Sequence, residues 1–193
     1  MEKKQFRNQL LAVMNKMNRT EHEKQSFDIT NRFLASTEFR EANTIGITIS
    51  RFPEVDTRLL IEAAWKAGKR IAVPKCNAVT RDMDFRVITS YDSLETVYMD
   101  LLEPIVDETE AINKDNISLQ IVPGVVFSSA GFRIGFGGGY YDRYMADFKG
   151  GALSLAFECQ TNYIVPVENH DIPVEKIFTE QQVILCRVSE CGK

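Results

Sequence analysis

The sequence predicts an α/β fold in which a mainly parallel sheet carries helices on both faces. Short apolar, β-branched stretches alternate with stretches of helical period along most of the chain. The 193 residues, 44% hydrophobic and 26% charged, suffice for a sizeable core. We therefore expect a single domain over residues 1–193, with a loose tail from about residue 188.

The amino-terminal part of the chain is expected to form two helices. From Lys3 to Met17, apolar side chains recur at intervals of three and four residues, as on one face of an amphipathic helix. A second helix is expected to begin with Thr20, because Glu23 follows three residues later as in a capping box, and to run to Leu34.

A strand–helix–strand unit follows these helices. Residues 43–50 are short and β-branched, and residues 70–75 are apolar and strand-like. The intervening residues 57–69 have a helical period, with Gly68 in the position of a stop.

The same alternation returns in the second half of the chain. Residues 118–127 predict a strand, residues 140–148 a helix and residues 151–158 another strand. Between the two units, residues 83–88 predict a strand and residues 103–116 a polar, turn-rich connection. Repeated strand–helix–strand units favour a parallel sheet. Ligands of such sheets bind beyond the carboxyl ends of the strands.

Five glycines fall between residues 131 and 139, directly before the predicted helix at residues 140–148. Glycine permits positive φ and close approach to the main chain, so this cluster serves a tight turn or a ligand. Free N–H groups at a helix start make a seat for phosphate. No Gly-Lys-Ser/Thr follows, and Tyr140 stands where G-x-G-x-x-G needs its last glycine, so both common nucleotide motifs are absent. Spacing alone leaves an anion cradle and a simple turn both open.

Charge and composition narrow the class of protein. With 23 Lys+Arg against 27 Asp+Glu, the net charge of −4 provides no general field for nucleic acid or an acidic membrane. No apolar run approaches the roughly 20 residues that cross a bilayer, and no signal peptide is recognised, so we expect a cytoplasmic protein. The four cysteines form no CxxC pair, which argues against zinc. A nucleophilic Cys159 near His170 is an alternative that remains open.

Residues 123–144, PGVVFSSAGFRIGFGGGYYDRY, carry the most specific motif of the chain. They resemble the signature of the 5-formyltetrahydrofolate cyclo-ligases, or 5,10-methenyltetrahydrofolate synthetases, in which P-G-x-x-F leads to R-[LI]-G-x-G-x-G-Y-Y-D. Four other stretches resemble family elements: KKQFR at 3–7, PEVDT at 53–57, AVPK at 72–75 and PVENHDIPVEKIFTE at 166–180. Phe136, where the family often has Arg or Tyr, and Glu175, where Asp is expected, depart from the pattern.

The resemblance implies a three-layer α/β/α fold and one reaction. ATP and 5-formyltetrahydrofolate would give 5,10-methenyltetrahydrofolate, ADP and phosphate, with Mg²⁺ as the cofactor. The formyl oxygen would first be phosphorylated, and N10 of the folate would then attack the activated carbon. Such a transfer depends on positioning and on neutralising phosphate charge. The expected partners of the protein are these two small molecules. The protein itself is expected to be a monomer.

The resemblance also implies the residues of the site. Arg133 and Asp142 are expected to be catalytic. The expected ATP-binding residues are Lys3, Lys4, Arg7, Arg133, Gly135, Gly137, Gly138, Gly139, Tyr141 and Asp142. The expected folate-binding residues are Ser50, Glu54, Phe136 and Tyr140, and the expected Mg²⁺ ligands are Asp142 and Asp171.

Several of these residues have structural alternatives. Lys3 and Arg7 share a helix face and could reach a nucleotide or form a solvated charged face. Glu54 suits the N–H-rich edge of a pterin, but could be a loop carboxylate in water. Asp142 could bind Mg²⁺ or favour a helix start through the dipole. Tyr141 could contact ligand or belong to the core.

Three further positions are weighed on the same basis. Lys75, at a strand end, is a weaker phosphate-binding candidate. Asp56 or Thr57 directly precedes a helical stretch and fits a helix cap. Two other functions also remain open: a non-catalytic nucleotide- or folate-binding protein, and a phosphosugar isomerase or acyl-CoA transferase on a similar sheet.

Overall fold

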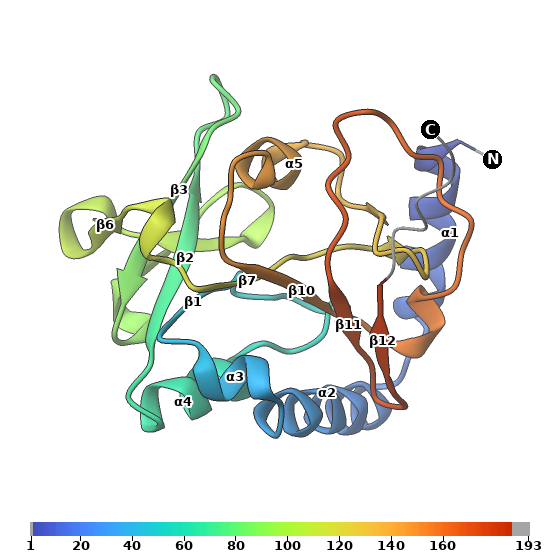
Figure 1. Ribbon diagram of the computed structural model, residues 1–193, viewed down its shortest axis with the longest axis horizontal. Helices are drawn as coiled ribbons and strands as arrows, with labels where there is room; N and C mark the ends of the chain where they lie inside the picture. Colours follow the sequence, from blue (N-terminus) through green and yellow to red (C-terminus); the bar gives the residue numbers. More distant parts are fainter. Residues whose placement is uncertain (1, 187–193) are drawn as a thin grey trace.

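The structure, a computed structural model, describes residues 2–186, so the predicted loose tail lies outside the described residues. The α-helices are α1 (Lys3–Met14), α2 (Arg19–Leu34), α3 (Thr37–Glu41), α4 (Arg58–Lys66) and α5 (Tyr140–Met145). In Figure 1, α2, α3 and α4 lie on one face of the central sheet and α5 lies on the other. The predicted three-layer α/β/α fold is therefore confirmed, with one thin layer.

Within the described residues, the central sheet has eight strands in the order β12-β11-β10-β7-β1-β2-β3-β6. They are β1 (Thr44–Gly46), β2 (Arg70–Cys76), β3 (Met83–Ile88), β6 (Glu110–Ile112), β7 (Leu119–Ile121), β10 (Gly151–Leu155), β11 (Lys176–Phe178) and β12 (Val183–Leu185). The inner pairs β2–β1, β1–β7, β7–β10 and β10–β11 are parallel. The outer pairs β11–β12, β2–β3 and β3–β6 are antiparallel.

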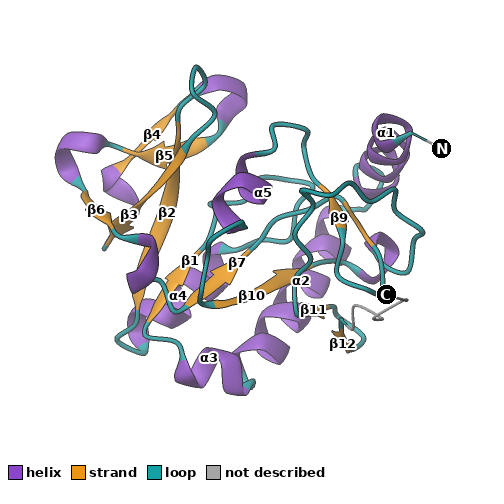
Figure 2. Ribbon diagram, turned by 45° about the horizontal axis from the view of Figure 1, so that its top comes forward, coloured by secondary structure: helices purple, strands orange, loops and turns teal. Residues whose placement is uncertain are grey.

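Two small hairpins stand beside the central sheet. Strands β4 (Leu94–Thr96) and β5 (Leu102–Pro104) pair near β2 and β3, as Figure 2 shows. Strands β8 (Val126–Phe127) and β9 (Arg133–Ile134) pair near α1. The hairpin β8–β9 leads directly into the glycine cluster, and α1 packs against it. Helix α1 therefore brings the amino terminus to this part of the chain.

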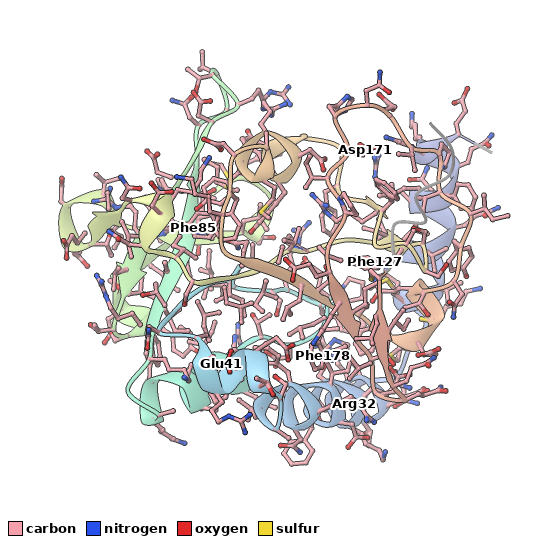
Figure 3. All side chains as sticks on the ribbon, viewed as in Figure 1. Arg32, Glu41, Phe85, Phe127, Asp171 and Phe178 are labelled. Carbon is pink, nitrogen blue, oxygen red and sulfur yellow. The ribbon has the colours of Figure 1, made fainter. Side chains whose placement is uncertain are left out.

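The core consists of two layers of apolar side chains, one on each face of the sheet. The larger cluster joins α1, α2 and α4 to the sheet and contains Phe33, Leu60 and Ile71. The smaller cluster lies under α5 and contains Phe85 and Phe127, both labelled in Figure 3. No helix of the described chain is long and apolar enough to span a bilayer.

Most predicted elements are found, with differences at their ends. The single strand predicted at residues 118–127 is wrong, because this stretch forms β7 in the central sheet and β8 in a separate hairpin. Helix α2 is capped by Asn18, whose side-chain oxygen accepts the Glu21 N–H at 2.8 Å, so the predicted capping box at Thr20 is wrong. The N-cap is therefore two residues earlier in the chain than the predicted Thr20, and its side chain pairs one N–H of the first helical turn. Gly68, at φ +72°, ends the α4 region as expected.

Two predictions need correction, and one helix was not expected. The segment 103–116, predicted as a connection, contains β6, which pairs with β3. Its polar residues are compatible with a strand because β6 is at the sheet edge. Helix α1 ends at Met14, earlier than the expected Met17, and the short helix α3 was not predicted.

Candidate active site

Residues 135–139, here called the glycine loop, connect β9 to α5. Gly137 has φ +100° and Gly139, the N-cap of α5, has φ +65°, values that other residues adopt only with strain. The backbone N–H groups of residues 136–139 donate no hydrogen bond within the described chain. The cluster therefore makes a tight turn and also presents unpaired donors.

Arg133 and Asp142 form a largely buried ion pair at the base of the glycine loop. Arg133 Nη2 lies 2.8 Å from Asp142 Oδ1, and the Arg133 side chain is only 3% exposed. Arg133 Nη1 also donates to the Ile172 carbonyl, and Asp142 Oδ1 accepts the Ile172 N–H. Burial lowers the pKa of Arg133, and the nearby Asp142 carboxylate opposes this shift. The expected catalytic pair is thus in direct contact.

Helix α1 brings two cations to the same region. Lys3 Nζ lies 2.8 Å from Asp171 Oδ2 and 2.9 Å from Glu168 Oε1. Burial acts to lower the pKa of Lys3, but its hydrogen bonds to these carboxylates outweigh that effect, and the net shift is upward. Arg7 Nε donates to the Gly135 carbonyl at 2.7 Å, with its guanidinium against Gly137. Lys3 and Arg7 therefore contact the body of the protein.

Asp171 completes this cluster. Its side chain is 8% exposed and accepts the Glu168 N–H as well as Lys3 Nζ. Burial raises the pKa of Asp171, and these hydrogen bonds lower it by more, so the net shift is downward. Asp171 precedes Ile172, which bonds to both Arg133 and Asp142. Lys4, in contrast, is exposed on α1.

The loop after β1 holds the expected folate-binding residues Ser50 and Glu54. Ser50 and Thr57 are mutually bonded, since the Ser50 N–H donates to Thr57 Oγ1 at 3.0 Å and the Thr57 N–H donates to Ser50 Oγ at 2.9 Å. Ser50 and Glu54 line a cavity of about 30 Å³. Burial raises the pKa of Glu54 to about 7, against a smaller lowering by Arg51. Glu54 is therefore half-buried and not a fully solvated loop carboxylate.

Tyr140 and Tyr141 differ in their surroundings. The Tyr140 hydroxyl lies 3.4 Å from the Asn77 carbonyl, on the turn between β2 and β3. The Tyr141 hydroxyl is buried and has no hydrogen-bond partner among the described residues. Burial, and then Cys76, raise the pKa of Tyr141 well above its usual value, and the Glu54 carboxylate adds to this. Tyr141 thus lies within electrostatic range of both Glu54 and Arg133. Phe136 is 47% exposed.

Other candidates have structural partners. Lys75 bonds to Glu95 at 2.6 Å, so its cation is already neutralised. Asp56 Oδ1 accepts the Arg58 N–H at 2.9 Å, consistent with the expected cap of α4. Burial raises the pKa of the Cys159 thiol, which disfavours the thiolate that a nucleophile needs.

The carboxylates fit a Mg²⁺ ion that takes most of its ligands from elsewhere. No group of three or more His, Cys, Asp and Glu side chains that could hold a metal ion is found within residues 2–186. Mg²⁺ commonly uses one or two carboxylates together with phosphate oxygens and waters. Asp142 and Asp171, joined through Arg133 and Ile172, supply that number.

Comparison with known proteins identifies the family. The family described as 5-formyltetrahydrofolate cyclo-ligase matches residues 1–180. The 5-formyltetrahydrofolate cyclo-ligase of Escherichia coli K12 is 31% identical over 148 residues, covering 74% of this chain and 80% of that protein. The enzyme of the same name from Mus musculus is 27% identical over 189 residues, covering 92% and 93%.

A solved structure agrees over the full length. The 5,10-methenyltetrahydrofolate synthetase of Aquifex aeolicus superposes with a TM-score of 0.85 at 26% identity, covering 100% of this chain and 97% of that one. A synthetase from Mycoplasma pneumoniae, at 21% identity and a TM-score of 0.76, shares the fold. These matches confirm the resemblance carried by residues 123–144, and the chain belongs to the 5-formyltetrahydrofolate cyclo-ligase family.

Proposed function

We propose that the protein catalyses the ATP-dependent cyclisation of 5-formyltetrahydrofolate to 5,10-methenyltetrahydrofolate, releasing ADP and phosphate. One observation carries this proposal: Arg7 and Arg133 border a glycine loop whose N–H groups are unpaired, and Lys3 bonds to Asp171, next to the Ile172 that bonds to Arg133. A half-buried carboxylate, Glu54, lies within electrostatic range of Tyr141. Membership of the cyclo-ligase family supports the folate as the second substrate.

The triphosphate of ATP is held by the glycine loop and its three cations. Helix α5 has only six residues, so its dipole adds little, and the unpaired N–H groups and side-chain charges supply the attraction. Burial makes the Arg133 guanidinium poorly hydrated, which favours a charge-assisted bond to a phosphate oxygen. Lys4 and Tyr141 remain candidate contacts, from the edge of α1 and the base of the loop.

The Mg²⁺ that accompanies ATP would be held by Asp142 and Asp171, and would neutralise phosphate charge during the transfer. These carboxylates are now paired with Arg133 and Lys3. The pairs fix the positions of both carboxylates, and the pair with Lys3 helps to lower the pKa of Asp171. Phosphate oxygens can take the place of the carboxylates as partners of the two cations.

The pterin of the folate binds at Glu54, with Ser50, Phe136 and Tyr140 as further contacts. A carboxylate accepts hydrogen bonds from the N–H groups of the pterin edge. The 30 Å³ cavity holds no more than about two waters, so residues around Glu54 must move to admit the ring. Displacing this loop also breaks the hydrogen bond between His22 and the Glu54 carbonyl, 2.7 Å long.

The chemistry proceeds in two displacements. The formyl oxygen attacks the γ-phosphorus of ATP, an oxygen–phosphorus bond forms, and ADP leaves. N10 then attacks the formyl carbon, its proton is lost, and the carbon–oxygen bond breaks to release phosphate. The chain's own part is to align the two substrates and stabilise the charge that moves.

The direct test mixes the purified protein with MgATP and 5-formyltetrahydrofolate. We expect growth of the near-ultraviolet absorbance of the methenyl product, with one ADP released per turnover. Product without ATP, or ADP release without folate, would show that the two reactions are not coupled as proposed.

A further inference from the structure

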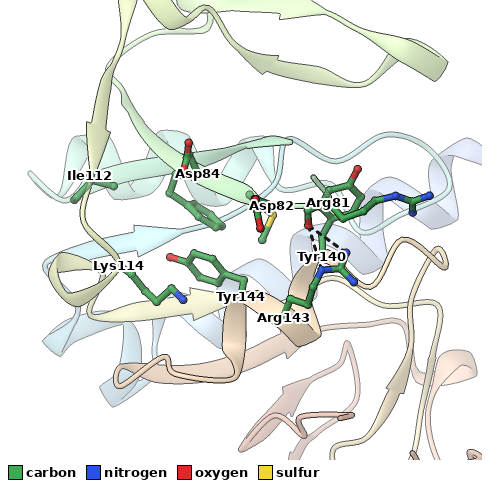
Figure 4. A pocket seen from close by; sticks show the side chains of 10 residues that line it. Arg81, Asp82, Asp84, Ile112, Lys114, Tyr140, Arg143 and Tyr144 are labelled. Atoms are coloured by element: carbon green, nitrogen blue, oxygen red, sulfur yellow. Dashed lines mark hydrogen bonds between the residues drawn. The ribbon is translucent and has the colours of Figure 1, made fainter. Parts of the chain in front are cut away.

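A second cavity, of about 320 Å³, lies between α5 and strand β3. Its wall combines the apolar or aromatic side chains of Met83, Phe85 and Tyr144 with several charged side chains. Tyr140 and Arg143 from α5 close one end together with Arg81, and Lys114 and Ile112 lie at the other end, as Figure 4 shows. The volume is at the low end of the roughly 300–1,000 Å³ of ligand pockets.

Arg143 is held at the mouth of this cavity by main-chain acceptors. Its Nε and Nη2 donate to the Arg81 carbonyl at 3.2 and 3.1 Å, and Nη2 also donates to the Gly138 carbonyl at 2.8 Å. The guanidinium centre lies 5.7 Å from the Tyr140 ring centroid. The two N–H groups on Nη1 make no hydrogen bond within the described chain. A fixed cation with unused donors therefore faces solvent beside an aromatic wall.

The charges of the cavity select the kind of anion. Asp82 and Asp84 also line it, so a triphosphate would meet repulsion there. A ligand with an aromatic ring and separate carboxylates fits better, because its ring can pack on the tyrosines while a carboxylate bonds to a guanidinium. Tyr140 links this cavity to the proposed pterin site. It lines the cavity, and the pKa of its neighbour Tyr141 is raised in part by Glu54.

We propose that this cavity binds the p-aminobenzoyl-glutamate part of 5-formyltetrahydrofolate, with Arg143 as the residue that recognises the glutamate carboxylate. The inference rests on the proposed function, which places the pterin at Glu54. Arg81, at the same end, assists, and its side chain has no partner within the described chain. Sequence reasoning missed Arg143, because one arginine on a predicted helix face resembles any solvated charge.

The test compares two substrates, one with the glutamate and one, 5-formyltetrahydropteroate, without it. For Arg143→Ala we expect a KM for 5-formyltetrahydrofolate raised about tenfold, the scale of a lost charge-assisted hydrogen bond. The KM for 5-formyltetrahydropteroate should stay unchanged. Arg81→Gly, which suits the positive φ of 63°, should give a smaller rise with the same selectivity. Arg70→Ala, an exposed arginine on β2, is the matched control.

Each outcome has one meaning. An equal rise in KM for both folate substrates would overturn the glutamate contact, and a raised KM for ATP alone would assign Arg143 to the nucleotide. If the wild-type protein forms no methenyl product, the proposed function fails separately. Calorimetric titration with p-aminobenzoylglutamate then tests the cavity without turnover: we expect binding weakened about tenfold by Arg143→Ala, and equal binding by both proteins would refute the inference.

Discussion

Arg133 is a cation placed where water cannot hydrate it, so its charge must be balanced by neighbours. Asp142 supplies that balance at 2.8 Å, and the Ile172 carbonyl accepts another of its N–H groups. Removing one partner of a buried pair usually costs more than the pair contributes, because the remaining charge is stranded. A substitution at Asp142 therefore affects both the fold and the proposed Mg²⁺ site, and the two effects need separate measurements.

We predict that Asp142→Asn gives a folded protein with greatly reduced activity and a raised Mg²⁺ requirement. The amide keeps an oxygen for Arg133 but loses the charge, which should cost about 1–2 kcal/mol and lower Tm by roughly 3–6 °C. Activity against Mg²⁺ concentration, measured beside the melting temperature, checks this. A lowered Tm with an unshifted Mg²⁺ curve and full activity would remove Asp142 from the metal site.

From the raised pKa of Glu54 we predict that the free energy of unfolding falls as the pH rises. Its pKa is about 7 in the folded chain against an ordinary 4.5, so the unfolded chain binds fewer protons between these values. Stability is therefore lost as pH rises from about 4.5 to 7, by up to about 3 kcal/mol. Glu54→Gln should abolish this loss. Denaturant titrations at about pH 4.5 and pH 8 check it, and equal pH curves for the two proteins would contradict the buried carboxylate.

The same substitution tests the folate contact. A glutamine cannot accept two charge-assisted bonds from a pterin, so we expect Glu54→Gln to weaken folate binding while leaving MgATP binding nearly intact. Titration of each ligand separately provides the measurement. An equal loss of both affinities would indicate a general structural role for Glu54.

At the level of elements, the periodic segments were the predictable ones. Helices α2 and α4 follow from apolar spacing, and strands β2 and β3 follow from short runs of apolar residues. Strand β6 was not predicted, because an edge strand needs few apolar residues and because its partner β3 lies about 25 positions earlier in the chain. The N-cap of α2 is Asn18 and not Thr20, because the Asn18 side-chain oxygen accepts the Glu21 N–H, a bond that the Thr20–Glu23 spacing does not indicate.

The glycine loop offers an element-scale prediction with an internal control. Gly138 lacks positive φ, and a side chain there would collide with the Tyr140 ring at 2.6 Å, so Gly138→Val should disturb folate as well as ATP binding. Gly139 is the sharper probe, because its φ is +65°. We expect Gly139→Ala to cost about 1–2 kcal/mol and to weaken ATP binding. Gly135→Ala, with nothing within 4 Å of the new carbon, should keep its stability.

Calorimetric ATP titrations and melting curves of Gly139→Ala and Gly135→Ala provide the comparison. If Gly139→Ala binds ATP as tightly as the wild type while losing stability, the loop is a turn without a ligand. That result would revive the structural alternative that spacing left open.

At the level of the whole molecule, the site depends on contacts between distant parts of the chain. The motif at residues 131–144 could be predicted because its residues are adjacent. The bond from Lys3 to Asp171 spans 168 positions, and the link from Arg7 to Gly135 spans 128. Spacing carries no signal for such pairs, so spacing alone favours a solvated face for Lys3 and Arg7, and only the family resemblance indicates the nucleotide. Only the packing of α1 against β8 and β9 distinguishes the two cases.

The packing of α1 leads to a prediction about ligand-linked stability. A ligand that binds only the folded chain stabilises it by about 2.7 kcal/mol at 100 times its Kd. If Lys3 and Arg7 hold the triphosphate, the double variant Lys3→Gln/Arg7→Gln should lose most of the Tm increase caused by MgATP. The increase caused by 5-formyltetrahydrofolate should remain, because Glu54 and Arg143 lie on other elements. Lys16→Gln, an exposed lysine just after α1, is the control. Both increases lost together would mean that α1 supports the fold in general, and both retained would remove Lys3 and Arg7 from the nucleotide site.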